Sequence, residues 1–326
     1  MPARTPARSG APPRARAAAG AGPPSAPGAG AGAGMDPLAG FSALTREWFT
    51  GAFAEPTPAQ SGAWASIAGG DNTLVIAPTG SGKTLAAFLW ALDRLARTPV
   101  PADPKLRCRV LYISPLKALA VDIERNLRAP LTGIRQVAHR RGLPEPDIRV
   151  AVRTGDTGAD ERRRLSTKPP DILITTPESL FLILTSKARD SLHGVDTVIV
   201  VVVHALAGNK RGAHQAISLE RLDALREGAA PGETGRARTE TDGLASGVPA
   251  QRIGLSATVR PPEEVATFLG GARPVTIAAP PYVKQMELRI VVPVEDMTDP
   301  DPPPASLRPF RGEFVQPPAQ PLRQAA

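Results

Sequence analysis

Residues 73–84, which read TLVIAPTGSGKT, constrain the fold more than any other part of the sequence. A short apolar run leads into a glycine-rich turn, and the turn precedes LAAFLWALDRLA, a segment rich in strong helix formers. A strand, a glycine-rich loop and a helix in this order are the context of a phosphate-binding P-loop. The alternative is an ordinary Gly/Ser turn before an amphipathic helix, but the complete order of strand, turn, GKT and helix favours the P-loop.

The residue types in this turn suit a triphosphate. Gly80 and Gly82 let backbone N–H groups approach phosphate oxygens, because no Cβ stands in the way. Lys83 is expected to reach the β- and γ-phosphates, and the Thr84 hydroxyl to hold Mg²⁺. The strict pattern begins with glycine, whereas this chain has Ala77. The sequence therefore predicts a nucleoside triphosphate site with one small departure from the pattern.

The two ends of the chain differ in composition from its centre. Residues 1–34 consist mostly of Ala, Gly and Pro and contain no acidic residue, and residues 300–326 are rich in proline. Such segments bury too little apolar surface to offset their chain entropy, so both are expected to be disordered tails. The remaining residues, 35–299, are enough for one large α/β domain. Within it, the polar, Gly- and Ala-rich residues 227–250 are expected to form a flexible insertion.

Cysteine content and charge narrow the class of protein. The one cysteine, Cys108, excludes an internal disulfide and a cysteine-rich metal site, and it fits a reducing cytoplasm. The N-terminus lacks the apolar stretch of a signal peptide, and no run approaches the length of a membrane span, so no membrane partner is expected. The net charge of +8 is compatible with a polyanion partner.

Strand-like and helix-like segments alternate along the chain. Strands are expected at residues 73–77, 109–114, 148–153, 171–175, 195–203, 252–255, 275–277 and 287–294. Helices are expected at residues 44–53, 59–68, from 85, from 115 and at 262–269, and residues 209–225 are expected to form a loop followed by a helix. This alternation predicts an α/β fold with a doubly wound, mostly parallel sheet and helices on both faces.

Polar residues follow several of the expected strands. Lys117 lies at a probable helix start after one strand, and Thr154 and Thr176 begin loops after two others. Each loop alone is more simply a turn with a helix cap, but the succession of them favours contacts to a nucleic-acid backbone. Gln60 would ordinarily be a surface residue; beside a P-loop, its donor and acceptor suit an adenine edge. Trp48, Phe49 and Phe53 are expected to pack in the core rather than stack on bases.

Seven short motifs make the chain resemble a known family. PTPAQ, APTGSGKT, SPLKALA, TGDT, TPESL, HALAGNKRGAH and LSAT occur in the order and spacing of superfamily 2 helicases of the DEAD/DEAH type. The block HALAGNKRGAH with SLERLDAL is most similar to the large helicase-related (Lhr) family of ATP-dependent DNA helicases. The resemblance covers roughly residues 41–295 and implies a RecA-like first motor domain.

The resemblance also implies site residues, cofactors and partners. It assigns adenine recognition to Gln60, and it implies ATP and Mg²⁺ as cofactors and nucleic acid, DNA by family likeness, as the partner. The triphosphate and Mg²⁺ would be held by Thr79, Gly80, Ser81, Gly82, Lys83 and Thr84. The nucleic-acid backbone would lie along Pro115, Lys117, Thr154, Gly155, Thr176 and Pro177. The nucleotide state would be coupled to that track by Ser256 and Thr258.

Motif II departs from the family pattern. The family carries Asp-Glu-x-His, whereas this chain has Val201, Val202 and Val203 before His204. The missing Asp would hold Mg²⁺ and the missing Glu would orient the attacking water, and valine has no lone pair for either task. We expect the fold to persist, because valine is favourable in a buried strand. ATP binding without efficient hydrolysis follows as the prediction, with no intact catalytic residue and with a core or hydrogen-bonding role for His204.

The family resemblance stops before a second RecA-like domain, which supplies an arginine finger and the other half of the ATP cleft. One reading is the motor domain of an ATP-dependent DNA helicase, truncated and deficient in hydrolysis. The alternative is a non-hydrolysing ATP- and DNA-binding pseudoenzyme, or half of a split helicase completed by a partner chain. An unrelated P-loop NTPase is a third reading, which would make SPLKALA, TPESL and LSAT coincidences.

Overall fold

The computed structural model describes residues 36–227 and 248–281. In these ranges seven strands form one sheet in the order β3-β4-β2-β5-β6-β1-β7, and every pairing is parallel. The strands are β1 (Thr73–Ile76), β2 (Val110–Ile113), β3 (Val150–Arg153), β4 (Ile172–Thr175), β5 (Thr197–Val201), β6 (Gln251–Ser256) and β7 (Thr276–Ala278). Because consecutive parallel strands need a crossover, helices lie between them in sequence, and the predicted doubly wound α/β sheet is confirmed.

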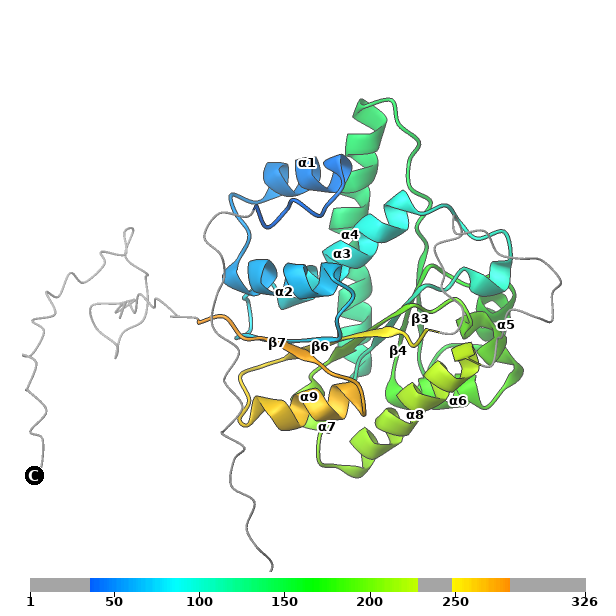
Figure 1. The fold of residues 1–326 in the computed structure, drawn as a ribbon. Helices are drawn as coiled ribbons and strands as arrows, with labels where there is room; N and C mark the ends of the chain where they lie inside the picture. Colours follow the sequence, from blue (N-terminus) through cyan, green and yellow to red (C-terminus); the bar gives the residue numbers. More distant parts are fainter. Residues whose placement is uncertain (1–35, 228–247, 282–326) are drawn as a thin grey trace, which may run out of the picture.

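Helices cover both faces of the sheet (Figure 1). The described helices are α1 (Ala43–Ala52), α2 (Pro58–Ala68), α3 (Lys83–Arg97), α4 (Lys117–Arg140), α5 (Ala159–Thr167), α6 (Pro177–Leu184), α7 (Val203–Leu206), α8 (Lys210–Glu227) and α9 (Pro262–Gly270). Helices α2, α3 and α4 pack on one face, and α6, α8 and α9 pack on the other. Each face encloses its own hydrophobic cluster, so the strands are buried on both sides, as parallel strands require. None of the described helices combines the length and apolar character needed to cross a bilayer.

A third, smaller cluster fixes α1 and α2. Phe49 is fully buried and lies against Trp64 with ring centroids 5.6 Å apart, in an edge-to-face arrangement. Trp48 is partly buried and packs on the same cluster. The expected core role is therefore confirmed for Trp48 and Phe49. It is wrong for Phe53, which is 43% exposed because it lies at the C-cap of α1, where its ring contacts those of these two aromatic residues.

The strand before motif II ends earlier than the sequence predicts. A buried strand was expected through Val203, but β5 ends at Val201 and α7 begins at Val203. Val202 joins them with φ 55° and ψ 40°, and it is the one non-glycine residue with positive φ in the described ranges. The argument from β-propensity is therefore wrong for Val202, because the turn from strand to helix dictates its backbone. A β-branched side chain in this left-handed region costs about 1–2 kcal/mol.

Other differences are small or lie beyond the described residues. Helix α4 begins at Lys117, so Pro115 precedes the helix rather than opening it. The tails 1–34 and 300–326 and the expected strand at 287–294 lie outside the described residues. The same holds for most of the expected insertion 227–250: Glu227 ends α8 and residues 248–250 lead into β6.

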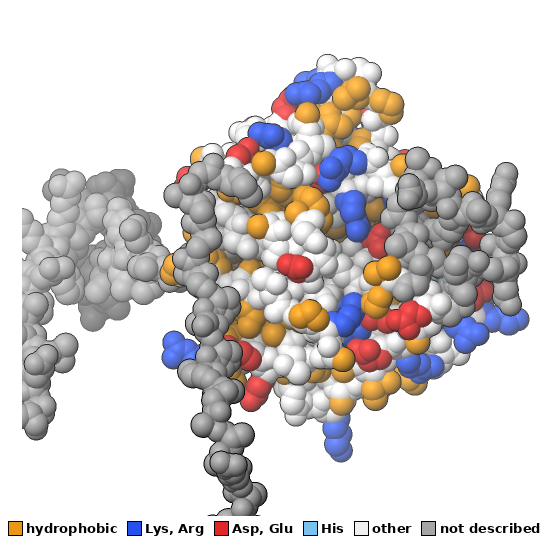
Figure 2. Space-filling view, in the orientation of Figure 1, with side chains coloured by type: hydrophobic (Ala, Val, Ile, Leu, Met, Phe, Trp, Pro, Cys, Tyr) orange, Lys and Arg blue, Asp and Glu red, His pale blue; other side chains and the backbone are white. Residues whose placement is uncertain are grey.

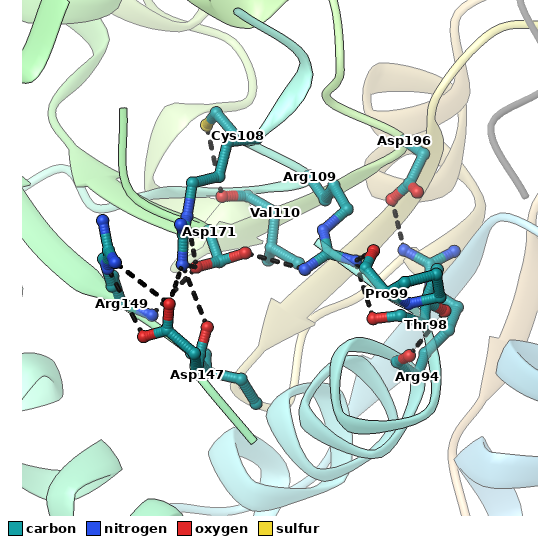
Figure 3. Close-up of polar contacts among 12 residues, drawn as sticks. Arg94, Thr98, Pro99, Cys108, Arg109, Val110, Asp147, Arg149, Asp171 and Asp196 are labelled. Carbon is teal, nitrogen blue, oxygen red and sulfur yellow. Dashed lines mark hydrogen bonds and ion pairs between the residues drawn. The ribbon is translucent and has the colours of Figure 1, made fainter. Parts of the chain in front are cut away.

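A buried ionic cluster joins the amino ends of the strands (Figure 3). Asp171, fully buried just before β4, accepts hydrogen bonds from Arg107 Nε and Nη2, each at 3.0 Å, and from Arg109 Nη2 at 2.7 Å. The same carboxylate accepts the backbone N–H of Arg149 at 3.0 Å, just before β3. One side chain thus ties together the entries to three neighbouring strands, at the edge of the sheet opposite the P-loop.

Helix α8 carries a buried amide inside an apolar face. Gln215 is fully buried one turn before Leu219, which belongs to the second hydrophobic cluster. Neither Oε1 nor Nε2 of Gln215 has a hydrogen-bond partner among the described residues. An unsatisfied buried polar group carries its full desolvation penalty, about 1–3 kcal/mol.

We therefore expect Gln215→Leu to raise the free energy of unfolding by about 1–3 kcal/mol, because leucine has a similar volume and no polar atoms. Urea denaturation measures this change. Gln136→Leu is a matched control, since Gln136 is exposed on α4 and its replacement should stay within about 0.5 kcal/mol of the parent. A destabilised Gln215→Leu variant would show that the amide has a partner that stabilises the fold.

Candidate functional site

All the predicted site residues except Gln60, which lies on α2, stand at or directly after the carboxyl ends of the parallel strands. The neighbouring strands β5, β6 and β1 end in motif II, the Ser256 segment and the P-loop. The neighbouring strands β3, β4 and β2 end in the loops that begin at Thr154, Thr176 and Ser114. Ligands of open α/β sheets bind at this edge. The topology therefore separates the predicted nucleotide residues from the predicted nucleic-acid residues along one edge.

The P-loop has the backbone that its glycines predict. Gly80 and Gly82 adopt φ of 83° and 79°, which only glycine adopts without strain. The loop closes on itself, because Ser81 Oγ donates to the Pro78 carbonyl at 2.7 Å. Gly82 then caps α3 directly, so the N–H groups of the first turn face the loop. This arrangement can bind a phosphate group.

Lys83 is the first residue of α3, and its side chain turns back over the loop. Its Nζ donates to the carbonyl oxygens of Ala77 and Pro78, each at 2.5 Å. Burial of the ammonium group lowers the pKa of Lys83, because the charged form loses solvation. An incoming phosphate would replace these two carbonyls with a formal negative charge, which favours the charged form of the lysine.

Helix α2 holds the P-loop from the side. Thr57 caps α2 and donates its hydroxyl to the Ser81 carbonyl at 2.8 Å. Gln60 is buried, accepts the Thr57 N–H at 2.9 Å and donates to the Gly82 carbonyl at 3.4 Å. A Cβ on Gly82 would lie 2.6 Å from Gln60 Nε2, so a larger residue here would displace the Gln60 amide in addition to straining the backbone. Gln60 thus lies against the P-loop, as the adenine-recognition hypothesis requires.

Thr57 is a site residue that the sequence analysis missed. The signal was present: Thr57 and Gln60 have the spacing of a capping box, and both of its reciprocal hydrogen bonds form. What the pattern does not reveal is the contact to Ser81, since that contact joins residues 24 positions apart.

Motif II lies two strands from the P-loop and presents only hydrocarbon side chains before His204. Val201, half-buried, ends β5 and is paired with Leu255 of β6. Val202 follows in its left-handed turn and is also half-buried. These are the two positions at which the resembling family carries carboxylates. In the described residues, moreover, no three His, Cys, Asp or Glu side chains come together as a metal site.

Ser256 links the two halves of the nucleotide region. It is the last residue of β6, is paired with Ile76 of β1, and accepts the Ala77 N–H through its carbonyl at 3.3 Å. Ser256 is buried, whereas Thr258 is exposed. The backbone of Ser256 therefore contacts the first residue of the P-loop, which is the position a coupling residue needs.

The predicted nucleic-acid residues divide by exposure. Pro115, Thr154, Thr176 and Pro177 are buried, and Gly155, like Lys117, is exposed. The Thr176 hydroxyl is used as the cap of α6, accepting the Ser179 N–H at 3.4 Å. The four buried members of the set expose little of either backbone or side chain, so Gly155 and Lys117 are the members that solvent reaches, and Lys117 carries a charge.

Two ion pairs lie near this edge, one between the segments after β2 and β3 and one between helices α6 and α8. Lys117 Nζ contacts Asp156 Oδ1 and Oδ2 at 2.7 and 2.8 Å, joining the loops after β2 and β3. Arg211 on α8 contacts both carboxylate oxygens of Glu178 on α6, at 2.5 and 3.0 Å. The hydrogen bond from Arg211 lowers the pKa of Glu178. On the face shown in Figure 2, basic side chains are interspersed with acidic and apolar ones.

The sequence analysis did not predict three members of these ion pairs as site residues: the acidic Asp156 and Glu178 and the basic Arg211. Asp156 and Glu178 stand inside the quoted motifs TGDT and TPESL, but their partners are 39 and 33 residues away in sequence. The sequence signal that could have revealed them is a carboxylate next to residues that otherwise suit an anion.

Comparison with known proteins agrees with this geometry. The family model described as DEAD/DEAH box helicase matches residues 57–266, more than half of the chain. The Lhr helicase/probable uracil glycosylase of Mycolicibacterium smegmatis is 62% identical over 267 residues, which are 82% of this chain and 16% of that protein. The Lhr helicase/uracil glycosylase of Escherichia coli is 54% identical over 263 residues, covering 79% of this chain and 16% of that protein.

Solved structures give the same result. The structure of Mycobacterium smegmatis helicase Lhr bound to ssDNA and AMP-PNP matches with a TM-score of 0.68 and 61% identity, over 82% of this chain and 31% of that one. The DEAD-box helicase Mss116 matches with a TM-score of 0.56 at 16% identity, which is a likeness of fold alone. The chain spans about a sixth of the length of the two bacterial curated relatives. The chain belongs to the DEAD/DEAH box helicase family, and it carries the RecA-like core domain of an Lhr-type helicase.

Proposed function

We propose that this domain binds ATP with Mg²⁺ at its P-loop and single-stranded nucleic acid, DNA by likeness to its relatives, along the loops after β2, β3 and β4. We further propose that it hydrolyses ATP very slowly. The observation that carries the proposal is the contrast within one edge of the sheet. The P-loop has its glycine conformations, its lysine and its supporting helix, whereas motif II has valines at both carboxylate positions.

Nucleotide binding follows from the loop itself. Phosphate oxygens would accept the N–H groups of residues 79–84, and Lys83 would leave the Ala77 and Pro78 carbonyls for the β- and γ-phosphates. Gln60 retains one lone pair and one N–H beyond its two present hydrogen bonds, which suffices for an adenine edge. The relative solved with AMP-PNP supports an adenine nucleotide as the ligand.

The metal has a reduced set of protein ligands. The Thr84 hydroxyl fits Mg²⁺, and the nucleotide's own phosphates would supply further oxygens. Val201 offers no oxygen at the position where a carboxylate would act. When bound, Mg²⁺ neutralises charge on the phosphates. The residues of this chain thus position the triphosphate, but Val202 cannot orient or deprotonate a water.

Nucleic-acid binding is proposed for the loops of β2, β3 and β4 together. Gly155 offers an exposed backbone N–H and Lys117 offers a charge, while Thr176 and Pro177 shape the start of α6 beside them. Backbone contacts of this kind position a strand without reading its sequence. The relative solved with ssDNA supports a single strand as the partner. Ser256 and Thr258 would then report the nucleotide state to this track.

A full motor would require a second RecA-like domain. We propose that residues 35–299 act as one such domain and that the opposite wall of the ATP cleft comes from another. The lengths of the relatives support this, since the matched region is a minor part of each. A domain that binds ATP and nucleic acid without turnover remains the second candidate function, favoured by the valines of motif II.

Lys83→Ala tests the proposal. We expect the affinity for an ATP analogue to fall about 10- to 100-fold, because a charge-assisted hydrogen bond to phosphate contributes about 1.5–3 kcal/mol. Titration of a fluorescent ATP analogue in the presence of Mg²⁺ measures this change.

Lys105→Ala is a matched control. Lys105 lies in the turn before β2, at the amino ends of the strands and away from the P-loop, and it is exposed and pairs with Asp190. It should bind the analogue like the parent. Equal affinity of the parent and Lys83→Ala would overturn the P-loop assignment.

A further inference from the structure

The ion pair between Lys117 and Asp156 bridges two loops at the proposed nucleic-acid edge. Lys117 follows β2 and Asp156 follows β3, and β4 lies between these strands in the sheet. The pair therefore reaches across the loop that begins at Thr176. Both side chains are open to solvent, with 56% of Lys117 and 73% of Asp156 exposed.

The contact has the chemistry of a phosphate contact. Both carboxylate oxygens of Asp156 accept from Lys117 Nζ, at 2.7 and 2.8 Å. The two non-bridging oxygens of a phosphodiester have the same charge and the same acceptor character. A nucleic-acid strand that uses Lys117 must therefore displace this carboxylate or share the ammonium group with it.

We propose that Asp156 competes within the chain for the backbone phosphate site at Lys117, and that it thereby sets the affinity for single-stranded nucleic acid and its salt dependence. This inference rests on the proposed function, because it requires the strand to pass Lys117.

The loop that carries Asp156 is held by its own hydrogen bonds. Thr157 Oγ1 accepts the Thr154 N–H at 2.9 Å, and Thr154 Oγ1 accepts the Asp156 N–H at 3.4 Å. Arg162 from α5 donates to the Gly155 carbonyl at 2.7 Å. The ammonium group of Lys117, by contrast, lies at the end of a long flexible side chain. Displacement by a phosphate thus moves the lysine head and leaves the carboxylate in place, where it repels the bound strand.

Two consequences follow for binding. The strand loses the energy of breaking an exposed ion pair, and it meets one like charge close to a phosphate. Each effect changes an equilibrium constant by up to about fivefold at low salt. In addition, a lysine already paired with a carboxylate neutralises no net phosphate charge. Its contribution to the salt dependence, about 0.7 in the slope of log K against log salt for single strands, is then suppressed.

The test compares Asp156→Asn with the parent chain, using a fluorescently labelled single-stranded DNA oligonucleotide at several salt concentrations. We expect Asp156→Asn to bind about 3- to 10-fold more tightly at low salt. We also expect its salt slope to be steeper by about 0.7. Asp160→Asn is the matched control: Asp160 is four residues away, is 97% exposed and pairs with Arg163 instead. It should bind within twofold of the parent.

A double-mutant cycle separates competition for Lys117 from a general effect of charge. In a Lys117→Ala background only the like-charge repulsion remains, so Asp156→Asn should improve affinity by a clearly smaller factor than it does in the parent chain. An equal gain in affinity with and without Lys117 would overturn the inference. So would an Asp156→Asn variant that binds the oligonucleotide no more tightly than Asp160→Asn does, when the parent chain itself binds. Absence of binding by every form would instead overturn the proposed function, and the inference with it.

Discussion

Replacing Val201 with Asp and Val202 with Glu is expected to raise the rate of ATP hydrolysis by about 10²–10⁴-fold. This range corresponds to regaining a general base alone, and regained metal placement adds to it. The positions are favourable, because both valines are half-buried at the carboxyl end of β5 and are separated from the P-loop strand only by β6. Phosphate release in the presence of Mg²⁺ and a single-stranded oligonucleotide measures the change.

The restored form should also fold, because the cost of replacing Val201, which packs on the first hydrophobic cluster, is partly offset at Val202. Val202 lies at φ 55°, where a β-branched side chain is strained, and Glu lacks the β-branch. If the two forms have similar denaturation midpoints, a higher rate of the restored form reflects the two carboxylates and not a better folded chain.

Three comparisons make this test specific. The two forms share every other residue, so the ratio of their rates isolates the two carboxylates. Adding Lys83→Ala to the restored form should abolish the gain, since the triphosphate would no longer be held. A parent chain that already hydrolyses ATP as fast as the restored form would show that another group does the work of the missing pair.

The P-loop is the part of the site that the sequence predicts best, because its determinants are local. Gly80, Gly82 and Lys83 lie within four residues, and the backbone angles follow from the residue types. The parallel sheet is predictable for a similar reason, since each strand is a short apolar run between a loop and a helix. Their order in the sheet, which separates the two halves of the site, came only with the structure.

The missed features depend on contacts that are distant in sequence. Thr57 reaches Ser81, Lys117 reaches Asp156 and Glu178 reaches Arg211, each across more than 20 residues. The prediction for Val202 was wrong for a different reason: its residue type favours a strand, but the fold requires a turn at that point. Propensity describes what a residue prefers, and at the carboxyl edge of this sheet the backbone path decides.

Replacing Asp171 with Ala is expected to lower the free energy of unfolding by about 3–5 kcal/mol. The carboxylate is fully buried and accepts hydrogen bonds from Arg107, Arg109 and the backbone of Arg149. Its removal leaves two guanidinium groups facing each other, of which Arg109 is almost entirely buried. Arg107 keeps a second carboxylate, Asp147 at 2.9 Å, so the largest penalty falls on Arg109.

Urea denaturation of Asp171→Ala, followed by circular dichroism, measures this loss against Asp160→Ala, whose exposed carboxylate should matter by less than about 0.5 kcal/mol. The cluster lies at the amino ends of the strands, away from the P-loop, so the folded fraction of Asp171→Ala should bind the ATP analogue with the parent's affinity. Because domains of this kind are stable by only about 5–15 kcal/mol, the loss removes a large share of the total. If Asp171→Ala were as stable as Asp160→Ala, the amino ends of β2, β3 and β4 would be held by packing alone, and the buried ion pairs would contribute nothing net to the fold.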